Sequence, residues 1–498
     1  MNYTYFTLTL YFMLMLGIGI YAAKKSTSNL SDYMLGGRKV SPQVTALSAG
    51  ASDMSGWMLM GLPGAIFVSG FSTIWVAVGL VVGAWANYKL VAPKLRVYTE
   101  VANDALTLPD FFGQRFHKKD GIIKLVSAIV VIIFFTLYTS AGLVGGGKLF
   151  ESAFGLDYQL GVFITMFVVV AYTLLGGFLA VSLTDFVQGV IMFIALVMVP
   201  VVAFTYFEST ETMMAYSLEE IPSFSQSLES LTVLSLLSSL AWGLGYFGQP
   251  HIIVRFMAID TVKNIKTARR IGMSWMTVTI VGALATGLTG VAYVNKYNVD
   301  LKDPETIFIF FSNVLFHPLI SGFLLAAILA AVMSTISSQL LVSSSSLTED
   351  IYRVYSKKKL SQKHLVNVGR GCVFVVALIA AVMALQPSSN ILGIVSNAWA
   401  GFGAAFGPLI LFCLLWERVT YSGALAGIIT GAATVLFWIY APVLEGGATL
   451  SSLVYEMLPG FLISALSIWL VSLWSEKPSK KITDQFKEVN QVLIESTS

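Results

Sequence analysis

Apolar stretches long enough to cross a membrane recur along almost all of the 498 residues. A helix needs about 20 predominantly apolar residues to span the hydrocarbon core of a bilayer. Only 11% of the residues are charged, whereas a soluble domain carries about 25%, because water must wet its surface. The chain is therefore predicted to be an all-α polytopic membrane protein. Thirteen stretches can be counted, at roughly residues 4–23, 42–70, 72–97, 124–150, 158–178, 185–206, 231–254, 272–294, 312–347, 366–386, 390–415, 421–441 and 452–474.

The basic residues predict which way the chain lies in the membrane, since loops on the cytoplasmic side carry an excess of Lys and Arg. With thirteen spans and the N-terminus outside, nearly all of the 30 basic residues fall on the cytoplasmic side. No Lys or Arg precedes Lys24, so the first stretch is expected to be a retained helix rather than a cleaved secretory signal. The basic residues left outside are Lys148, Lys296 and Lys302.

Two spans carry glycine and proline in a way that ordinary lipid-facing helices do not. The second reads Ser48-Ala-Gly-Ala-Ser-Asp-Met-Ser-Gly-Trp57 and then Gly61-Leu-Pro-Gly64, and the seventh reads Trp242-Gly-Leu-Gly-Tyr-Phe-Gly-Gln-Pro250. Interrupted helices in corresponding positions of two halves indicate the binding site of a transporter. Five spans separate the two interruptions, which predicts two five-helix repeats of opposite orientation. Two independent kinks with packing roles are the alternative.

This repeat prediction divides the chain into six parts. The connection after the sixth span is acidic, and the stretch after Trp474 is polar and charged. The parts are 1–40, a first helix and a cytoplasmic loop; 41–206, the first repeat (spans 2–6); 207–230, an extracellular loop with Glu208, Glu211, Glu219, Glu220 and Glu229; 231–416, the second repeat (spans 7–11); 417–474, two peripheral helices; and 475–498, a cytoplasmic tail or short helix.

Asp53 lies near the middle of the interrupted second span. A carboxylate at the centre of a bilayer costs about 2.5–3.5 kcal/mol on insertion scales, so it needs a partner or a wet cavity. We therefore expect Asp53 to shape a substrate site. The alternative is a carboxylate that backbone amides of its own broken helix satisfy.

The ninth span is rich in hydroxyl groups, at Ser334, Thr335, Ser337, Ser338 and Ser343–Ser346. Sodium is a hard cation that prefers oxygen ligands, and hydroxyls together with the open carbonyls of a broken helix can supply them. Small residues also allow membrane helices to pack closely, which is the alternative for any single serine. The prediction of a sodium site therefore depends on pairing this span with the second.

Aromatic side chains occur in or near the interrupted spans, at Trp57, Tyr138, Trp242 and Tyr246. They could wall a small apolar or cyclic substrate. Trp and Tyr are also common anchors at the membrane surface. That alternative applies most to Tyr138, because it stands alone within its span.

The sequence carries no signature of catalysis or of cofactor binding in the structural context that such a signature requires. The run from Gly243 to Gly248 fits a dinucleotide fingerprint, but it lies in an apolar span without the strand and helix that the fingerprint requires. The four histidines are scattered, so no metal-ligand spacing arises. No nucleophile elbow is present either. We expect a protein that is not an enzyme and that needs no cofactor.

Several of these segments together carry a family resemblance. The run from Ser48 to Trp57 closely resembles the second helix of the solute:sodium symporter family, in particular of bacterial members that carry proline. The resemblance extends from about Tyr33 to Trp474. Other similar segments are Leu35–Arg38, Leu175–Phe178, Trp242–Pro250 and Ala331–Thr335.

The family resemblance implies both a fold and a function. The fold would have thirteen transmembrane helices, an outside N-terminus and a leucine-transporter-type core of two inverted repeats, in a bacterial cytoplasmic (inner) membrane. The function would be sodium-coupled symport of L-proline into the cell by alternating access. Sodium would be the coupling ion, and neither nucleic acid nor an obligate protein partner is expected.

The resemblance also implies which residues bind each ligand. Sodium would be held by backbone oxygens of Ala51, Met54 and Ala331 and by the hydroxyls of Ser334 and Thr335. Proline would lie between the broken helices, near Asp53, Gly56, Trp57, Tyr138, Trp242, Tyr246 and Pro250.

Three further residues would act in coupling or gating. Asp185 matches an acidic position that the family links to sodium dependence; as an alternative, Ser182 to Asp185 begins a helix and Asp185 is only part of its cap. Arg38 matches a basic position on the cytoplasmic side, where an ordinary positive-inside residue is the alternative. Ser55, beside Asp53, is the third.

The sequence alone is compatible with other functions. The nearest is the same fold carrying a sugar, a vitamin or a different amino acid, which competition by unlabelled solutes would separate. A rival of another class is a channel or a membrane solute sensor. Electrical recording would reveal a channel by a conductance far above carrier turnover.

Overall fold

The computed structural model describes residues 3–25, 30–118, 121–219, 232–356, 361–386 and 390–497. These residues are helical almost throughout, and the only β-type pairing among them is an isolated bridge between Val40 and Ile259. Ten of the helical segments described are long and apolar enough to cross a membrane. The chain is therefore an all-helical protein with many membrane crossings.

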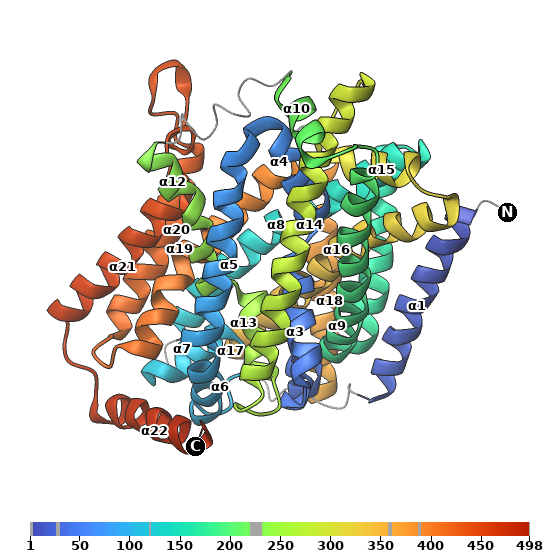
Figure 1. The fold of residues 1–498 in the computed structure, drawn as a ribbon. Helices are drawn as coiled ribbons and strands as arrows, with labels where there is room; N and C mark the ends of the chain where they lie inside the picture. Colours follow the sequence, from blue (N-terminus) through green and yellow to red (C-terminus); the bar gives the residue numbers. More distant parts are fainter. Residues whose placement is uncertain are drawn as a thin grey trace.

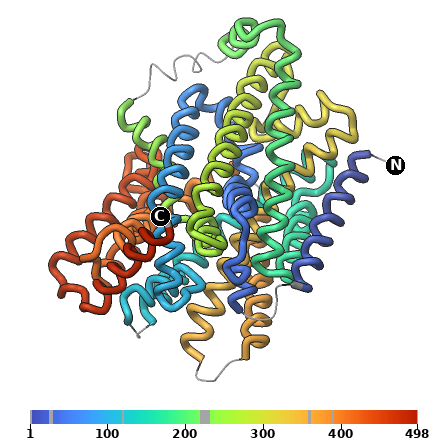
Figure 2. The backbone as a smooth tube through the Cα atoms, turned by 60° about the horizontal axis from the view of Figure 1, so that its bottom comes forward, coloured from blue at the N-terminus to red at the C-terminus, as the bar shows by residue number. Residues whose placement is uncertain are grey.

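The long helices stand side by side in one bundle. α1 (Tyr3–Lys25) flanks it on one side, and α20 (Tyr421–Tyr440) and α21 (Met457–Trp474) flank it on the other (Figure 1, Figure 2). The remaining long helices are α5 (Thr73–Leu90), α8 (Ile122–Phe154), α9 (Tyr158–Phe204), α14 (Ile265–Tyr297), α16 (Pro318–Ser345), α18 (Gln362–Ala384) and α19 (Ile391–Leu415).

Short helices cover both ends of the bundle. Figure 1 draws α10 (Thr210–Glu219) and α15 (Ile307–Val314) at the top, and α6 (Ala92–Val101), α7 (Leu108–Phe116) and α22 (Lys480–Thr497) at the bottom. α2 (Leu30–Leu35) is a further short helix. Glu220 and Glu229 of the predicted acidic loop lie outside the described residues, and the described part of that loop forms α10.

The second predicted span is broken in its middle. α3 (Pro42–Asp53) ends where Met54 takes a ψ of 77°, outside the helical range. A π-helical turn, η2 (Trp57–Gly61), then leads into α4 (Leu62–Ser69). The predicted interruption is confirmed, and it leaves Asp53 as the last residue of a half-helix.

The seventh predicted span is broken as well. α12 (Val233–Leu240) continues as a 3₁₀ stretch, η4 (Ala241–Gly248), and Gln249 is extended before α13 (Pro250–Ala258) begins. Glycines let the backbone of η4 touch that of α5: a Cβ on Gly83 would lie 2.1 Å from the carbonyl oxygen of Gly243. This close approach holds η4 against α5.

α9 covers two predicted spans, 158–178 and 185–206, in one element of 47 residues. A straight helix of that length would measure about 70 Å, more than twice the hydrocarbon thickness of a bilayer. The helix turns at Gly177, whose φ of 56° and ψ of −144° suit glycine. A Cβ there would lie 2.6 Å from the ring of Tyr33. The gap between the two predicted spans, 179–184, is helical, because the turn comes earlier, at Gly177.

The ninth predicted span, 312–347, begins too early. Its first residues belong to α15, and α16 starts at Pro318 after a cap by His317. α16 continues through a π-helical stretch, η6 (Ser346–Tyr352), into α17 (Arg353–Tyr355). α15 is itself apolar, so hydropathy alone does not separate it from its neighbour.

Candidate functional site

The two broken helices meet at Asp53. Its side chain is buried, and the hydroxyl of Tyr246 in η4 donates a hydrogen bond to Oδ2. Oδ1 has no hydrogen-bond partner among the described residues. Because buried carboxylates usually have partners for both oxygens, Asp53 keeps an unused acceptor at the centre of the bundle. The alternative that backbone amides of its own helix satisfy this carboxylate is wrong, since the partner in the described chain is Tyr246.

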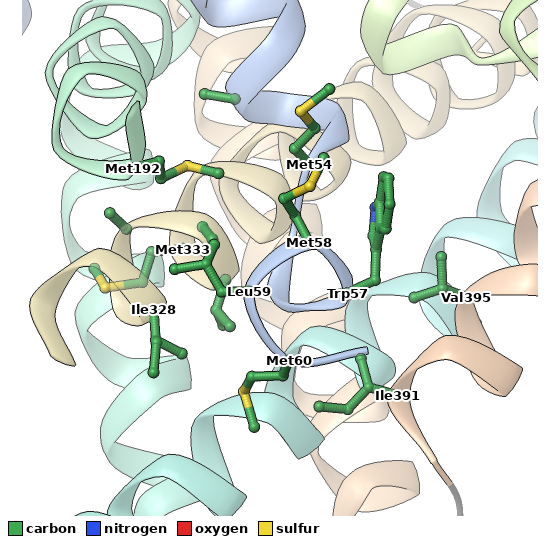
Figure 3. Close-up of a cluster of buried hydrophobic side chains, with 14 of the residues drawn as sticks. Met54, Trp57, Met58, Leu59, Met60, Met192, Ile328, Met333, Ile391 and Val395 are labelled. Atoms are coloured by element: carbon green, nitrogen blue, oxygen red, sulfur yellow. The ribbon is translucent and has the colours of Figure 1, made fainter. Parts of the chain in front are cut away.

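The backbone carbonyl of Asp53 is freed by the break and takes two aromatic partners. The indole Nε1 of Trp57 donates to it at 3.0 Å, and the hydroxyl of Tyr138 on α8 donates at 3.3 Å. In Figure 3, Trp57 points from the π-helical turn toward Val395, whereas Leu59 lies on the side of Met333. The structure thus brings together four of the predicted substrate residues, from the four helical segments α3, η2, α8 and η4.

Four of the five predicted sodium ligands also lie together, where α16 crosses α3. Ser334 Oγ donates to the carbonyl oxygens of Ala51 at 2.7 Å and Ala331 at 3.1 Å. Thr335 Oγ1 donates to the same two oxygens at 3.4 and 3.2 Å. Met54, the fifth, follows the end of α3. Carbonyl and hydroxyl oxygens beside an unwound helix are the donor set that suits sodium.

Gly56 and Ser55 complete the turn between α3 and η2. A Cβ on Gly56 would lie 3.2 Å from a methyl group of Val332, so the turn packs tightly against α16. The backbone N–H of Trp57 donates to Ser55 Oγ at 3.4 Å, and the N–H of Ser55 donates to the carbonyl of Asp53 at 2.9 Å. Ser55 therefore holds the shape of the break.

Trp242 and Pro250 lie apart from Asp53. The ring of Trp242 stacks on Tyr455 with centroids 5.1 Å apart, and both line a cavity of about 740 Å³. Pro250 lines a different cavity, of about 20 Å³, with Met34 and Thr107. These two predicted substrate residues thus line two different cavities, and neither Asp53 nor Tyr246 is among the lining residues of either one.

Asp185 forms a buried ion pair instead of a cap. It lies inside α9, eight residues beyond the turn at Gly177, so the capping alternative is wrong. Arg255 Nη2 on α13 lies 3.0 Å from Asp185 Oδ2, and Ser48 Oγ donates to the same oxygen at 2.7 Å. Ser338 of α16 donates to it at 3.4 Å. The pair joins α9 and α13 to α3 and α16.

Arg38 joins the loop after α6 to the end of α13. It lies in a short turn, η1 (Gly36–Arg38), and its guanidinium pairs with Asp104 at 2.7 Å. It also donates to the carbonyls of Ala105 at 2.9 Å and of Met257, on α13, at 2.7 Å. Burial lowers the pKa of Arg38, and the charge of Asp104 opposes that shift. Arg38 therefore makes specific contacts, unlike an ordinary surface residue.

Comparison with known proteins identifies the family. A sequence model of the sodium:solute symporter family matches residues 33–431. This chain belongs to that family. It is therefore a transporter and not an enzyme.

Close relatives match over nearly the whole length. The osmoregulated proline transporter OpuE of Bacillus subtilis is 58% identical over 478 residues, which cover 95% of each chain. Sodium/proline symporter 2 of Staphylococcus saprophyticus is 52% identical over 497 residues, 99% of this chain and 97% of the relative.

Solved transporters share the fold at low sequence identity. A Na⁺-coupled sialic acid symporter in a substrate-bound, outward-open state has a TM-score of 0.81 at 18% identity, covering 96% of this chain and 99% of its own. Mhp1, a nucleobase-cation symporter in a closed conformation, has a TM-score of 0.54 at 13% identity, covering 93% and 99%.

Sequence reasoning missed several residues of this symporter. Arg255 was not singled out, although it is the only cation in the run Pro250–Ala258, which is otherwise mostly apolar. Arg96 was missed as well. Its Nε donates to the carbonyl of Ile259 at 2.7 Å, two residues beyond the carbonyl of Met257 that accepts from Arg38. A lone arginine in an apolar run is the signal that marks Arg255, whereas Arg96 stands between Lys94 and Glu100 and carries no such signal.

Proposed function

We propose that this symporter couples the uptake of L-proline to the inward movement of sodium by alternating access. The contact between Asp53 and Tyr246 carries the proposal, because it joins two broken helices directly beside a cluster of sodium-type oxygens. Relatives named as a proline transporter and a sodium/proline symporter, 58% and 52% identical over nearly the full length, support the choice of substrate and ion.

We further propose thirteen crossings arranged as two inverted repeats, 41–206 and 231–416. Ten of the described helical segments are long and apolar enough to cross a membrane. The turn at Gly177 would divide α9 into two crossings, and the two broken spans would add two more, which makes thirteen. The first helix and its loop (1–40), the outer loop (207–230), the peripheral pair (417–474) and the tail (475–498) complete the chain. The basic residues favour an outside N-terminus in a bacterial inner membrane.

In this proposal sodium binds at the crossing of α3 and α16. Its ligands are the carbonyls of Ala51, Met54 and Ala331 and the hydroxyls of Ser334 and Thr335. In the structure the two hydroxyls donate to the carbonyl oxygens of Ala51 and Ala331. Bound sodium holds the first half of the broken second span against α16 and so favours the state that binds substrate. It shifts the equilibrium only by the difference in its affinity for the two states.

Proline binds between the breaks. Its ammonium group approaches the free oxygen of Asp53, and its ring packs among Trp57, Tyr138 and Tyr246. Its carboxylate faces the N-terminal, positive end of the segment that begins at Gly56. Trp242 lines the approach from one side and Pro250 the release route on the other.

Asp185, Arg38 and Ser55 serve coupling and gating. Asp185 and Arg38 both hold α13, through Arg255 and through the carbonyl of Met257. These contacts must loosen for α13 to swing away and open the inner side. Ser55 preserves the turn that places Asp53 against Tyr246.

The membrane potential contributes to accumulation. One net positive charge that moves inward with each proline gains about 2.3 kcal/mol per 100 mV. That energy supports roughly fifty-fold accumulation of proline before the sodium gradient adds its share.

Uptake of labelled proline into proteoliposomes tests the proposal. Accumulation is expected with an inward sodium gradient, and it should collapse when the gradient is removed. Correctly inserted protein that takes up no proline would exclude this substrate. Competition by unlabelled solutes would then search for the true one.

A further inference from the structure

A small cavity lies beside Asp53, between α3, α5, α13 and α14. It has a volume of about 20 Å³, and its lining includes Asp53, Tyr246 and Asn87. A cavity needs about 10–15 Å³ to hold one water molecule, together with two or more polar partners. One water fits this space.

Asn87 on α5 is buried beside this cavity, and its side-chain amide has no hydrogen-bond partner among the described residues. It is 1% exposed, and neither Nδ2 nor Oδ1 has a hydrogen bond within the described chain. Burying an amide without hydrogen bonds is costly. In folded proteins, an unpaired buried polar group of this kind often marks an ordered water.

Asp53 presents the matching acceptor. Its Oδ2 accepts a hydrogen bond from the hydroxyl of Tyr246, whereas Oδ1 has no partner in the part of the chain that the structure describes. A water in the cavity would accept from Asn87 Nδ2 and donate to Asp53 Oδ1. Water suits the space better than a cation, because the amide offers a donor as well as an acceptor and most of the remaining lining is apolar.

We propose that a water molecule in this cavity joins Asn87 to Asp53, and that Asn87 thereby positions the carboxylate that binds the substrate. With Oδ2 fixed by Tyr246 and Oδ1 by the water, the plane of the carboxylate is set before the ammonium group arrives. Asn87 is thus a positioning residue that acts from α5 without touching the substrate. The inference rests on the proposed role of Asp53 in proline binding.

Two substitutions separate positioning from packing. Asn87→Leu keeps the size of the side chain but cannot bond to the water, and it should raise the KM for proline about tenfold. Its maximal rate and the amount of inserted protein should stay near normal. Asn87→Ser leaves room for a second water, so its KM for proline should stay near the wild-type value, unlike that of Asn87→Leu.

The control is Met273→Leu, on the α14 wall of the same cavity. It conserves volume and polarity, so the KM should not change. A purely structural role for Asn87 would lower the amount of folded protein and the maximal rate while leaving the KM unchanged. That result would overturn the proposal.

A high-resolution density map provides a second test that does not need transport. A peak bonded to both Asn87 and Asp53 is expected in the wild type, in sodium and also with choline in its place, and it should vanish in Asn87→Leu. An empty wild-type cavity would overturn the proposal. So would a peak that disappears in choline, because it would then be a cation. If the wild type took up no proline, the proposed function would fail while the map would still decide this inference.

Discussion

Neutralising one side of the ion pair between Asp185 and Arg255 is expected to destabilise the folded protein strongly. The two side chains are 0% and 1% exposed, and the charged atoms lie 3.0 Å apart. Removing one partner of a buried pair costs about 3–5 kcal/mol, because the remaining charge stays buried without compensation. Asp185→Asn and Arg255→Gln should each lower the free energy of unfolding by about that amount, a hundred-fold or larger change in the equilibrium constant.

The double variant isolates the interaction between the two charges. Asp185→Asn with Arg255→Gln leaves no unpaired charge, so it should be less destabilised than the sum of the single variants by more than about 1 kcal/mol. Denaturant titration of the four proteins in detergent micelles gives the required free energies.

The matched control is an ion pair at the surface. Glu417 and Lys487 lie 3.8 Å apart, with side chains 42% and 69% exposed. Glu417→Gln should cost less than about 1 kcal/mol, because water already screens both charges. Single buried variants that cost as little as this control, or a double variant equal to the sum of the singles, would refute the reasoning.

Three further outcomes are expected. Asp53→Asn should abolish or cripple sodium-coupled uptake in protein that still inserts; near-normal uptake would remove Asp53 from the site. Thr335→Val keeps the shape but removes a hydroxyl from the Ala51 carbonyl, so half-maximal uptake should need about tenfold more sodium, and an unchanged sodium titration would leave this hydroxyl a packing role. Gly177→Ala forces a side chain into a conformation with φ of 56°, which should cost about 1–3 kcal/mol and lower the unfolding temperature; an equal temperature would show that the turn tolerates a Cβ.

The local pattern was enough to find the helix breaks. Gly and Pro act on the backbone of their own segment, so the interruptions near Gly56 and Pro250 could be read from neighbouring residues alone. Asp53 stood out for a similar reason, since a carboxylate in an apolar span has a high cost wherever the partner lies.

The partners themselves could not be found in this way. Tyr246 and Arg255 reach their carboxylates across 193 and 70 residues of chain, and hydropathy carries no information about which helices touch. The family resemblance supplied the oxygen ligands on α3 and α16 but not the arginine opposite Asp185. Boundaries failed where two apolar helices adjoin, as at α15 and α16, because composition does not change there.

The contact of the C-terminal helix α22 with α6 offers a route for spectroscopy. α22 packs on α6, and Gln485 of α22 donates to the carbonyl of Val101, the last residue of α6. A few residues beyond Val101, Asp104 pairs with Arg38, and the carbonyl of Ala105 accepts a hydrogen bond from the same arginine. A fluorophore on the outer face of α22 is therefore close to the contacts that Arg38 makes, because only α6 and the residues just after it lie between them. It also lies away from the residues proposed to bind sodium and proline. Changes in its emission during turnover would report movement at this end of the bundle without labelling any residue proposed to bind the ion or the substrate.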